Sequence, residues 1–432
     1  MGRRAWTNWA GNQHCVPHAV QRPRTEAELV SVVERAAAAG RRVKAVGAGH
    51  SFTDIACTDG HLVDLAEYGR LLSFDPATCR ATVQAGIRLT ELNRLLAERG
   101  AALPNLGDIA YQSIAGATAT ATHGTGRRFG NLATTIVGMR LITGDGSVVT
   151  CSADDDPDLL RIARVGLGAL GLVSELTLQC VPAFNLHAVE EPMLVDEVLD
   201  DWEGFLDRND HFELFWVPNT RWALTKRNRR TTEPARPRSP WVRWRNGVLY
   251  DNVAFGAANR VARRRPSAVR RLGKALPSAG RVEYVEPSHQ VFASPRHVHF
   301  VEMEYAVPLA AVPEALNRVR ALVKTERLPL LFPVEVRAVA ADDIPLSPAH
   351  GRETGYLAVH VYRGTPQEPY FSGVEAIMDD YGGRPHWGKV HGQRAGTLSV
   401  RYPAWAEFLA ARERLDPGRT FANPYLERVL GP

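Results

Sequence analysis

Helical and strand periodicities alternate through the first 180 residues. Thr25 followed by Glu28 forms a capping box that predicts the start of an amphipathic helix, which ends at Gly40. The apolar residues of this helix recur at helical spacing: Leu29, Val32, Val33 and Ala36. Residues 41–46 then read as a strand, and this strand runs directly into a glycine-rich turn at residues 47–52. The N-terminal part of the chain is therefore expected to contain a helix, then a strand that leads directly into a glycine-rich turn.

The alternation continues to a boundary at Pro182. Residues 80–85 predict a strand, and Thr90 is expected to cap a second helix. The Gly-Asp-Gly sequence at 144–146 predicts a hairpin turn between two strands. A strictly alternating strand follows over residues 172–180. We expect a first domain built from these elements.

Residues 184–395 have a different character, with aromatic strand patterns and a helix expected at 312–324. The strands are predicted at 212–217, 297–305, 331–339 and 356–362. This mixture predicts a second, α+β domain. The last 30 residues read as a helix followed by a terminal loop.

The charge of the chain is concentrated in one segment. The 432 residues carry a net charge of +5, yet the stretch from Arg221 to Lys274 alone holds 16 basic residues against two acidic ones. The rest of the chain is therefore net acidic. The stretch lacks a recognisable nucleic-acid-binding module, so we expect no nucleic-acid partner. A solvated basic face, peripheral contact with an anionic membrane, and a pocket rim for an anionic substrate all stay open.

Cysteine usage and hydropathy favour a cytoplasmic protein. The five cysteines are widely spaced without a C-x-x-C pair, which is typical of a reducing compartment. The chain has no run of 18 apolar residues, so we expect no transmembrane segment. His297 and His299 share a strand face, but without cysteine or carboxylate spacing they favour a structural pair, and we expect no metal site.

Two glycine-rich and small-residue segments together indicate a large cofactor. Glycines in the turn at 47–52 let backbone N–H groups approach a pyrophosphate, and His50 lies within this turn. The run from Ser113 to Gly126 has almost no large side chain, so a flat or extended ligand can lie along its backbone. Taken alone, that run is equally typical of a small-residue helix or loop.

A polar set on two expected strands is a candidate for substrate chemistry. Glu335 and Arg337 alternate on one strand and share a face, and His360 and Tyr362 do so on another. Charged residues on an apolar strand must be paired if buried, so a structural ion pair is the alternative to a cavity lining. Lys389 adds a cation suited to orient a polyol.

Several motifs, in order along nearly the whole chain, resemble the sugar-lactone and alditol oxidases, which are vanillyl-alcohol oxidase-type FAD flavoproteins. The motifs are Thr7-Asn8-Trp9-Ala10-Gly11-Asn12, Gly47-Ala48-Gly49-His50-Ser51-Phe52, Leu103-Pro104-Asn105-Leu106-Gly107-Asp108, Ala121-Thr122-His123-Gly124-Thr125-Gly126, Glu335-Val336-Arg337 and His386-Trp387-Gly388-Lys389. The resemblance implies an α+β fold of two domains. It implies an FAD-binding domain at 1–183, completed by 396–432, and a substrate-binding cap domain at 184–395 with a large antiparallel sheet.

The resemblance also implies which residues hold FAD. His50 matches the position that carries the covalent flavin in many relatives. The other cofactor-binding positions it implies are Gly47, Ala48, Gly49, Ser51, Phe52, Gly107, Asp108, Ser113, Gly116, Thr120, Ala121, Thr122, His123, Val173 and His386.

On the substrate side, the resemblance implies that Glu335, Arg337 and Lys389 are catalytic. The implied substrate-binding set is Asp108, Glu335, Arg337, His360, Tyr362 and Lys389. Arg337 and Lys389 would polarise the reacting hydroxyl of a sugar 1,4-lactone or polyol, while Glu335 positions Arg337. Hydride would pass to flavin N5, and O2 would be reduced to hydrogen peroxide. The small residue at Gly107 favours an oxidase, and Asp108 and Tyr362 resemble the lactone-oxidising branch. A dehydrogenase with a quinone or cytochrome acceptor, and an oxidase of alditols or sugar intermediates, are the alternatives.

Overall fold

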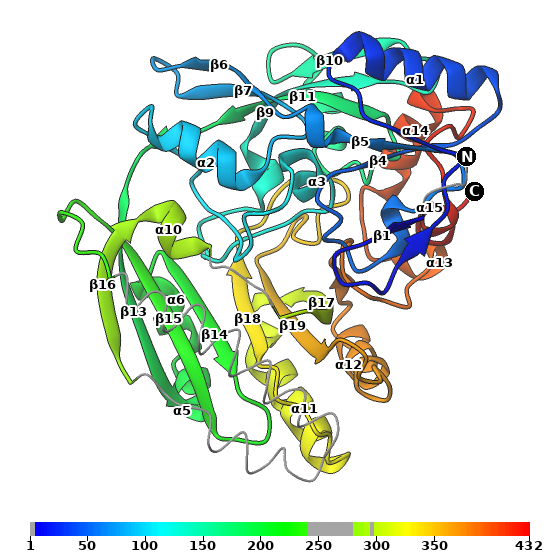
Figure 1. Ribbon diagram of the computed structural model, residues 1–432. Helices are drawn as coiled ribbons and strands as arrows, with labels where there is room; N and C mark the ends of the chain where they lie inside the picture. Colours follow the sequence, from blue (N-terminus) through cyan, green and yellow to red (C-terminus); the bar gives the residue numbers. More distant parts are fainter. Residues whose placement is uncertain (1–4, 240–279, 294–297) are drawn as a thin grey trace.

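The strands of the computed structural model, which describes residues 5–239, 280–293 and 298–432, form two systems (Figure 1). The first contains a three-stranded parallel sheet, β3-β5-β4, and a five-stranded antiparallel sheet, β10-β9-β11-β7-β6. The strands of these two sheets are β3 Ala19–Gln21, β4 Val43–Val46, β5 His61–Asp64, β6 Leu71–Asp75, β7 Arg80–Gln84, β9 Ile136–Ile142, β10 Val148–Ser152 and β11 Leu172–Gln179. Two short pairs accompany these sheets: β1 Trp6–Thr7 with β2 His14–Cys15, and β8 Ala101–Ala102 with β12 Val181–Pro182.

The second system is one eight-stranded antiparallel sheet in the order β16-β13-β15-β14-β18-β19-β17-β20. Its bounds are β13 Asn185–Leu194, β14 His211–Trp216, β15 Trp222–Thr231, β16 Val282–Pro287, β17 Phe300–Pro308, β18 Val334–Val339, β19 Thr354–Tyr362 and β20 Arg384–Pro385. The four strands expected in this region are confirmed with shifted ends, although His297 lies outside the described residues. The large antiparallel sheet of the expected fold is therefore present.

Helix α1, Glu26–Ala38, begins as the capping pattern predicts. The Thr25 hydroxyl accepts the N–H of Glu28 at 3.2 Å. The Glu28 carboxylate, however, accepts the N–H of Arg24, so the reciprocal bond to Thr25 is not the one formed. Leu29, Val32, Val33 and Ala36 are buried, which confirms the helical spacing of the apolar residues.

Two expectations about the helices were wrong, namely the start of the second helix and the terminal loop. Helix α2, Leu89–Ala97, begins after Arg88, and Thr90 lies inside its first turn. The N–H groups of Leu89 and Thr90 donate to the carbonyls of residues 112 and 110, so this helix start needs no side-chain cap. The expected terminal loop contains helix α15, Pro424–Leu430, which begins where the Asn423 side chain accepts the N–H of Leu426.

The remaining helices lie around and between the two sheet systems (Figure 1). Their bounds are α3 Ile114–Ala119, α4 Pro157–Ala163, α5 Val195–Asp200, α6 Trp202–Arg208, α10 Ser288–Phe292, α11 Val312–Thr325, α12 Tyr370–Asp379, α13 Ala395–Leu398 and α14 Trp405–Leu415. Helix α3 occupies part of the small-residue run, which combines a short helix with extended backbone after Ala119. The described residues contain no helix that is both long and apolar enough to cross a membrane.

The eight-stranded sheet has one apolar face and one polar face. Met303, Tyr305 and Val307 of β17 belong to a hydrophobic core that also contains residues of α5, α6, α11 and α12. Side chains alternate between faces along a strand, so Glu302 and Glu304 point the other way. This polar face is turned toward the first sheet system, because Glu304 bonds His123 and Arg337 pairs with Asp108.

The two hydrophobic cores interleave along the sequence. The first core joins residues before 187 to Phe292, Ile344, Trp387 and the C-terminal helices α14 and α15. The second takes residues between 195 and 378 together with Ala10 and Phe52. The domain bounds at 1–183, 184–395 and 396–432 stay a prediction.

Much of the described basic segment is neutralised within the sheet. Arg227 pairs with Glu191, and Arg238 pairs with Glu286. The Arg230 guanidinium lies 4.2 Å from the centre of the Phe184 ring. These arginines serve sheet packing, while residues 240–274 of the segment lie outside the described residues.

Candidate active site

A deep hollow in the first sheet system brings together most of the glycine-rich residues expected to bind the cofactor. It has a volume of about 1180 Å³ including its open mouth, which suits a large ligand. The expected residues that line it are Gly47, Ala48, Gly49, His50, Ser51, Ser113, Gly116, Thr120 and Val173. The two segments singled out by their small side chains therefore lie on one cavity.

Close approach of the two segments explains their glycines. A Cβ added to Gly47 would lie 1.9 Å from the Ser113 hydroxyl oxygen, so no other residue fits without a shift. Gly49 has a φ of +67°, which L side chains rarely adopt. Among the described residues, the N–H groups of positions 48–51 donate to no other protein group. Free amides in a tight turn suit a phosphate group, and the turn therefore fits the pyrophosphate of a dinucleotide.

His50 sits at the mouth of this turn in its neutral form. Its ring stacks on Trp9, with 5.1 Å between the ring centres. Burial, followed by the nearby charges of Arg88 and Lys389, lowers the pKa of His50 to about 4. At neutral pH the imidazole is therefore uncharged, with a nitrogen lone pair that can act as a nucleophile.

The other expected cofactor residues lie outside the lining of that hollow. They are Phe52, Gly107, Asp108, Ala121, Thr122, His123 and His386. Phe52 belongs to the second hydrophobic core, and its ring lies 5.1 Å from the Lys389 ammonium. Asp108 and His123 reach the polar face of the eight-stranded sheet. Asp108 and His123 therefore connect their segments of the first sheet system to the eight-stranded sheet.

Arg337 is the centre of a buried ion cluster on that polar face. Its Nη2 lies 2.7 Å from Asp108 Oδ1 and 3.2 Å from Glu213 Oε2, and it also contacts Glu335. Burial alone would lower the pKa of Arg337, but Asp108, Glu335 and Glu213 outweigh it and raise that pKa well above its usual value. One permanent cation thus faces three carboxyl groups, one from the 103–108 segment and two from the sheet.

A second ion cluster lies on the neighbouring strands. Lys389 Nζ contacts Glu302 of β17, and His360 Nε2 of β19 lies 3.6 Å from the other carboxylate oxygen. His360 Nδ1 lies 3.1 Å from the carbonyl of Pro333, which fixes the orientation of the ring. Tyr362 lies one pleat beyond His360 and packs against the second hydrophobic core. Five of the six expected substrate residues therefore belong to the two clusters.

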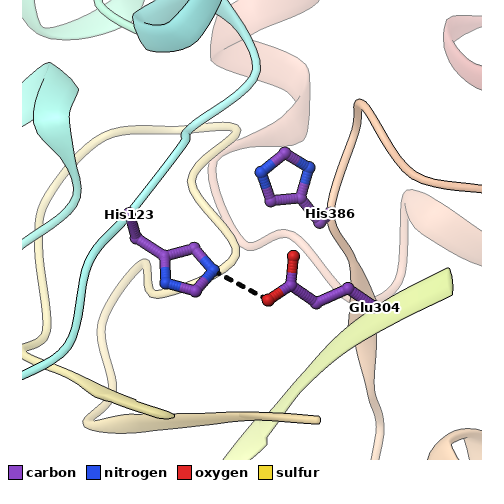
Figure 2. A group of neighbouring side chains, drawn as sticks. All are labelled: His123, Glu304 and His386. Atoms are coloured by element: carbon purple, nitrogen blue, oxygen red, sulfur yellow. Dashed lines mark hydrogen bonds and ion pairs between the residues drawn. The ribbon is translucent and has the colours of Figure 1, made fainter. Parts of the chain in front are cut away.

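Figure 2 shows a third group, in which His123 and His386 flank Glu304. His123 Nε2 lies 3.1 Å from Glu304 Oε1, and its Nδ1 lies 2.8 Å from the carbonyl of Gly124. His386 Nδ1 accepts the N–H of Gly388. Burial raises the pKa of Glu304, but His123 outweighs this effect and lowers it; burial lowers the pKa of His386 to about 3. The Glu304 carboxylate is thus hydrogen-bonded to the His123 imidazole, and the neutral imidazole of His386 lies beside them.

The sequence reasoning missed three carboxylates, Glu213, Glu302 and Glu304. Each is a charged residue on an otherwise apolar strand, and each is no more than 5% exposed. The same signal selected Glu335 and Arg337, so the rule could have found all three.

The comparisons with known proteins agree with this arrangement. Residues 176–429 match the family described as D-arabinono-1,4-lactone oxidase. The chain belongs to this family. Residues 17–152 match an FAD binding domain, and they contain the glycine-rich turn and the small-residue run. The FAD binding domain identifies FAD as the cofactor of this D-arabinono-1,4-lactone oxidase family member.

Relatives of this lactone oxidase family match along the whole chain. The L-gulono-1,4-lactone dehydrogenase of Mycobacterium tuberculosis is 48% identical over 428 residues, 99% of each chain. The L-gulonolactone oxidase of Scyliorhinus torazame is 36% identical over 98% of this chain and 97% of its own. A solved solvent-stable cholesterol oxidase shares the fold, with a TM-score of 0.83 at 20% identity over 98% of this chain and 97% of that one. The chain therefore has the α+β, vanillyl-alcohol oxidase-type fold of an FAD-dependent sugar-lactone oxidoreductase.

Substitution of Gly47 tests the close approach in the cofactor hollow. We expect Gly47→Ala to lower the flavin content of the purified protein, measured as the ratio of visible to ultraviolet absorbance, because the new methyl collides with the Ser113 side chain. Combining it with Ser113→Gly, which removes that side chain, should restore part of the flavin. Ser113→Gly alone is the control, and a double variant as empty as Gly47→Ala would contradict the steric explanation.

Removal of the buried guanidinium tests the ion cluster. Arg337→Met leaves Asp108, Glu213 and Glu335 without their cation, which should destabilise the protein by about 3–5 kcal/mol. The loss should appear as a lower melting temperature. Arg337→Lys keeps the charge and should lose less; a variant as stable as wild type at pH 8 would refute the cluster's role.

Proposed function

We propose that the chain takes a hydride from a hydroxyl-bearing carbon of a sugar 1,4-lactone, of the gulono- or arabinono-lactone kind, and reduces O2 to hydrogen peroxide. The observation that carries this proposal is the placement of Arg337. It lies on the polar face of the eight-stranded sheet, in contact with Asp108 from the cofactor-side segment. The names of the relatives, which include a gulonolactone dehydrogenase and a gulonolactone oxidase, support the substrate class.

The chain's own residues orient and polarise the sugar in this proposal. Arg337 and Lys389 donate to the reacting oxygen and stabilise the negative charge that it carries when the hydroxyl loses its proton to water. The hydride then leaves the carbon, and the C–O bond becomes a carbonyl. Glu335 contacts Arg337 and so fixes the direction of its donors, while it accepts from a second sugar hydroxyl. His360, held by Pro333, and Asp108 complete the contacts to the sugar. Bound FAD supplies the acceptor for the hydride.

The relatives differ in whether they are named oxidase or dehydrogenase, and Gly107 supports O2 as the electron acceptor of this chain. A Cβ added to Gly107 would lie 3.0 Å from the carbonyl oxygen of His123 and 3.6 Å from a Thr122 methyl. The bare glycine leaves a small molecule such as O2 a way past this point. A dehydrogenase with another acceptor is the second candidate, because the relative that is 48% identical carries that name.

A coupled assay tests the proposed reaction. Purified protein should be yellow and should form peroxide under air with sugar 1,4-lactones. The same preparation should be assayed with alditols and free sugars, and with an artificial dye in place of oxygen. Turnover that needs the dye would establish the dehydrogenase instead. A flavin-loaded protein that oxidises none of these compounds would refute the proposed function.

Enlarging residue 107 separates the two acceptors. We expect Gly107→Ala to lower the peroxide-forming rate by about tenfold, which corresponds to about 1.4 kcal/mol, while dye-coupled turnover stays close to wild type. The added methyl would meet the His123 carbonyl oxygen and a Thr122 methyl and would narrow the path for oxygen there. Equal losses with both acceptors would show that Gly107 has no special part in oxygen access.

His50 is proposed to hold FAD covalently through its ring nitrogen. Its neutral imidazole at the turn suits a nucleophile, since its pKa is lowered to about 4 by burial. Acid precipitation of wild-type protein should leave the yellow colour in the pellet. His50→Ala should release all of its flavin into the supernatant, with Trp9 and the turn still in place. Wild-type flavin that leaves entirely with the supernatant would remove His50 from this role.

A further inference from the structure

Cys15 and Cys57 are neighbours in space, although helix α1 and strand β4 separate them along the chain. Strands β3 and β5 are parallel and pair Ala19 with His61. The contact continues before both strands begin, because the N–H of His18 lies 2.8 and 2.9 Å from two carbonyls just before β5. The same register continued backwards along both segments places Cys15 beside Cys57.

The two thiols point at each other. A side-chain hydrogen bond joins the Cys57 thiol to the Cys15 thiol. A disulfide forms only between side chains that face each other at short range, and this hydrogen bond meets that condition. Both residues are intermediate between buried and exposed, so a small oxidant in solution can reach them.

The other three cysteines are less suited to a disulfide. Cys151 is fully buried, and Cys180 is only 2% exposed. Cys79 and Cys180 are neighbours, since the N–H of Cys180 donates to the carbonyl of Cys79, but the Cys180 thiol is directed at the carbonyl of Leu178 at 3.9 Å. Cys79 therefore serves as a matched control for an accessible thiol.

The pair lies at the edge of the cofactor hollow. Cys15 of β2 pairs with Trp6 of β1, and Trp6 lines the hollow. Cys57 directly follows Ile55 and Ala56, which line the same hollow. The two thiols thus belong to two separate parts of its wall.

Each of these two parts is held by non-covalent contacts. The β1–β2 hairpin packs on the glycine-rich turn, where the N–H of Trp9 donates to the carbonyl of Gly49 at 2.8 Å. On the other side, the Asn423 amide donates to the carbonyl of Cys57 at 2.9 Å. A bond between the two sulfur atoms would add a covalent link between the hairpin and the wall.

We infer that Cys15 and Cys57 form a reversible disulfide under hydrogen peroxide, and that this bond fastens the β1–β2 hairpin to the wall of the cofactor hollow. The O–O bond of peroxide breaks when the Cys15 sulfur takes one oxygen and becomes a sulfenic acid, with release of one water. The Cys57 sulfur then attacks the sulfenic sulfur, the S–S bond forms, and a second water leaves with the Cys57 proton. The two thiols lose two electrons and two protons, and peroxide is reduced to water.

Burial decides which thiol reacts first. Burial, together with the neighbouring Cys15, raises the pKa of Cys57 to about 12, so the Cys57 thiol keeps its proton at neutral pH. The thiolate is the form that attacks peroxide, so the first step is assigned to Cys15 and Cys57 is the resolving thiol. The proposed oxidase reaction is one source of peroxide. A reducing compartment returns the pair to the dithiol by thiol–disulfide exchange.

Peptide mapping of peroxide-treated protein tests the disulfide. Reduced holoprotein is treated with added hydrogen peroxide, denatured in a thiol-blocking reagent and digested. We expect one crosslinked pair of peptides, which contain Cys15 and Cys57, and a loss of two from the five titratable thiols. Dithiothreitol should reverse both changes. The crosslink should be absent from Cys15→Ser and Cys57→Ser and should persist in Cys79→Ser.

Two results would overturn the disulfide. One is wild-type protein whose thiols stay reduced under peroxide. The other is wild-type protein in which Cys15 or Cys57 is oxidised to sulfinic or sulfonic acid without the crosslink. Because peroxide is added and no lactone turnover is measured, neither result depends on the proposed function, which the coupled assay tests separately.

The melting temperature tests the fastening of the hairpin. The disulfide closes a long loop, residues 15–57, and so restricts the unfolded chain. Oxidised wild-type protein should therefore melt about 3 °C or more above the same protein after dithiothreitol. Peroxide-treated Cys57→Ser is the control and should show no such rise. A crosslinked wild-type protein that melts no higher than the reduced form would overturn the fastening.

Discussion

The need to neutralise buried charge on one face of the eight-stranded sheet governs the arrangement of this protein. Arg337 has to meet carboxylates because a desolvated guanidinium is costly without them. Two of these carboxylates, Glu213 and Glu335, come from the sheet, but Asp108 comes from the cofactor-side segment. The Glu304 contact with His123 crosses the same junction. These two contacts tie the eight-stranded sheet to the first sheet system, and they hold both in one geometry.

The cofactor side is organised by the opposite requirement, which is closeness of backbone. Gly47 and Ser113 approach so nearly that a single methyl group would collide with a hydroxyl. The turn at 48–51, with its free amides, and the small residues between Ser113 and Thr120 line the same hollow. Glycine in the turn and alanine in the run are therefore consequences of the ligand's size and shape. Where the sheet needs long charged side chains, this surface needs almost none.

Part of the site could be predicted because its residues violate a local rule. Glu335 and Arg337 stand out as charges on an apolar strand, and the glycine-rich turn stands out by its lack of side chains. Glu213, Glu302 and Glu304 break the same rule and could have been selected by it, but the rule does not say which partners they meet. The expected cap at Thr90 failed for a related reason, because distant carbonyls satisfy the first turn of α2. A capping pattern uses only residues within about four positions of one another, so it does not predict a hydrogen bond to a distant carbonyl.

The sequence by itself determined the family, the glycine-rich cofactor turn, several of the strands and helices, and which residues share a face of one strand. The local features depend on spacing along the chain. The tertiary structure decided which strands are neighbours. Only the order β14-β18-β19-β17 places Glu213 beside Arg337 and Ala358 between Glu335 and Glu304. Strand order depends on backbone hydrogen bonds between residues far apart in the chain, and local sequence patterns do not predict these bonds. For this reason the pairing of the buried charges emerged only from the folded sheet.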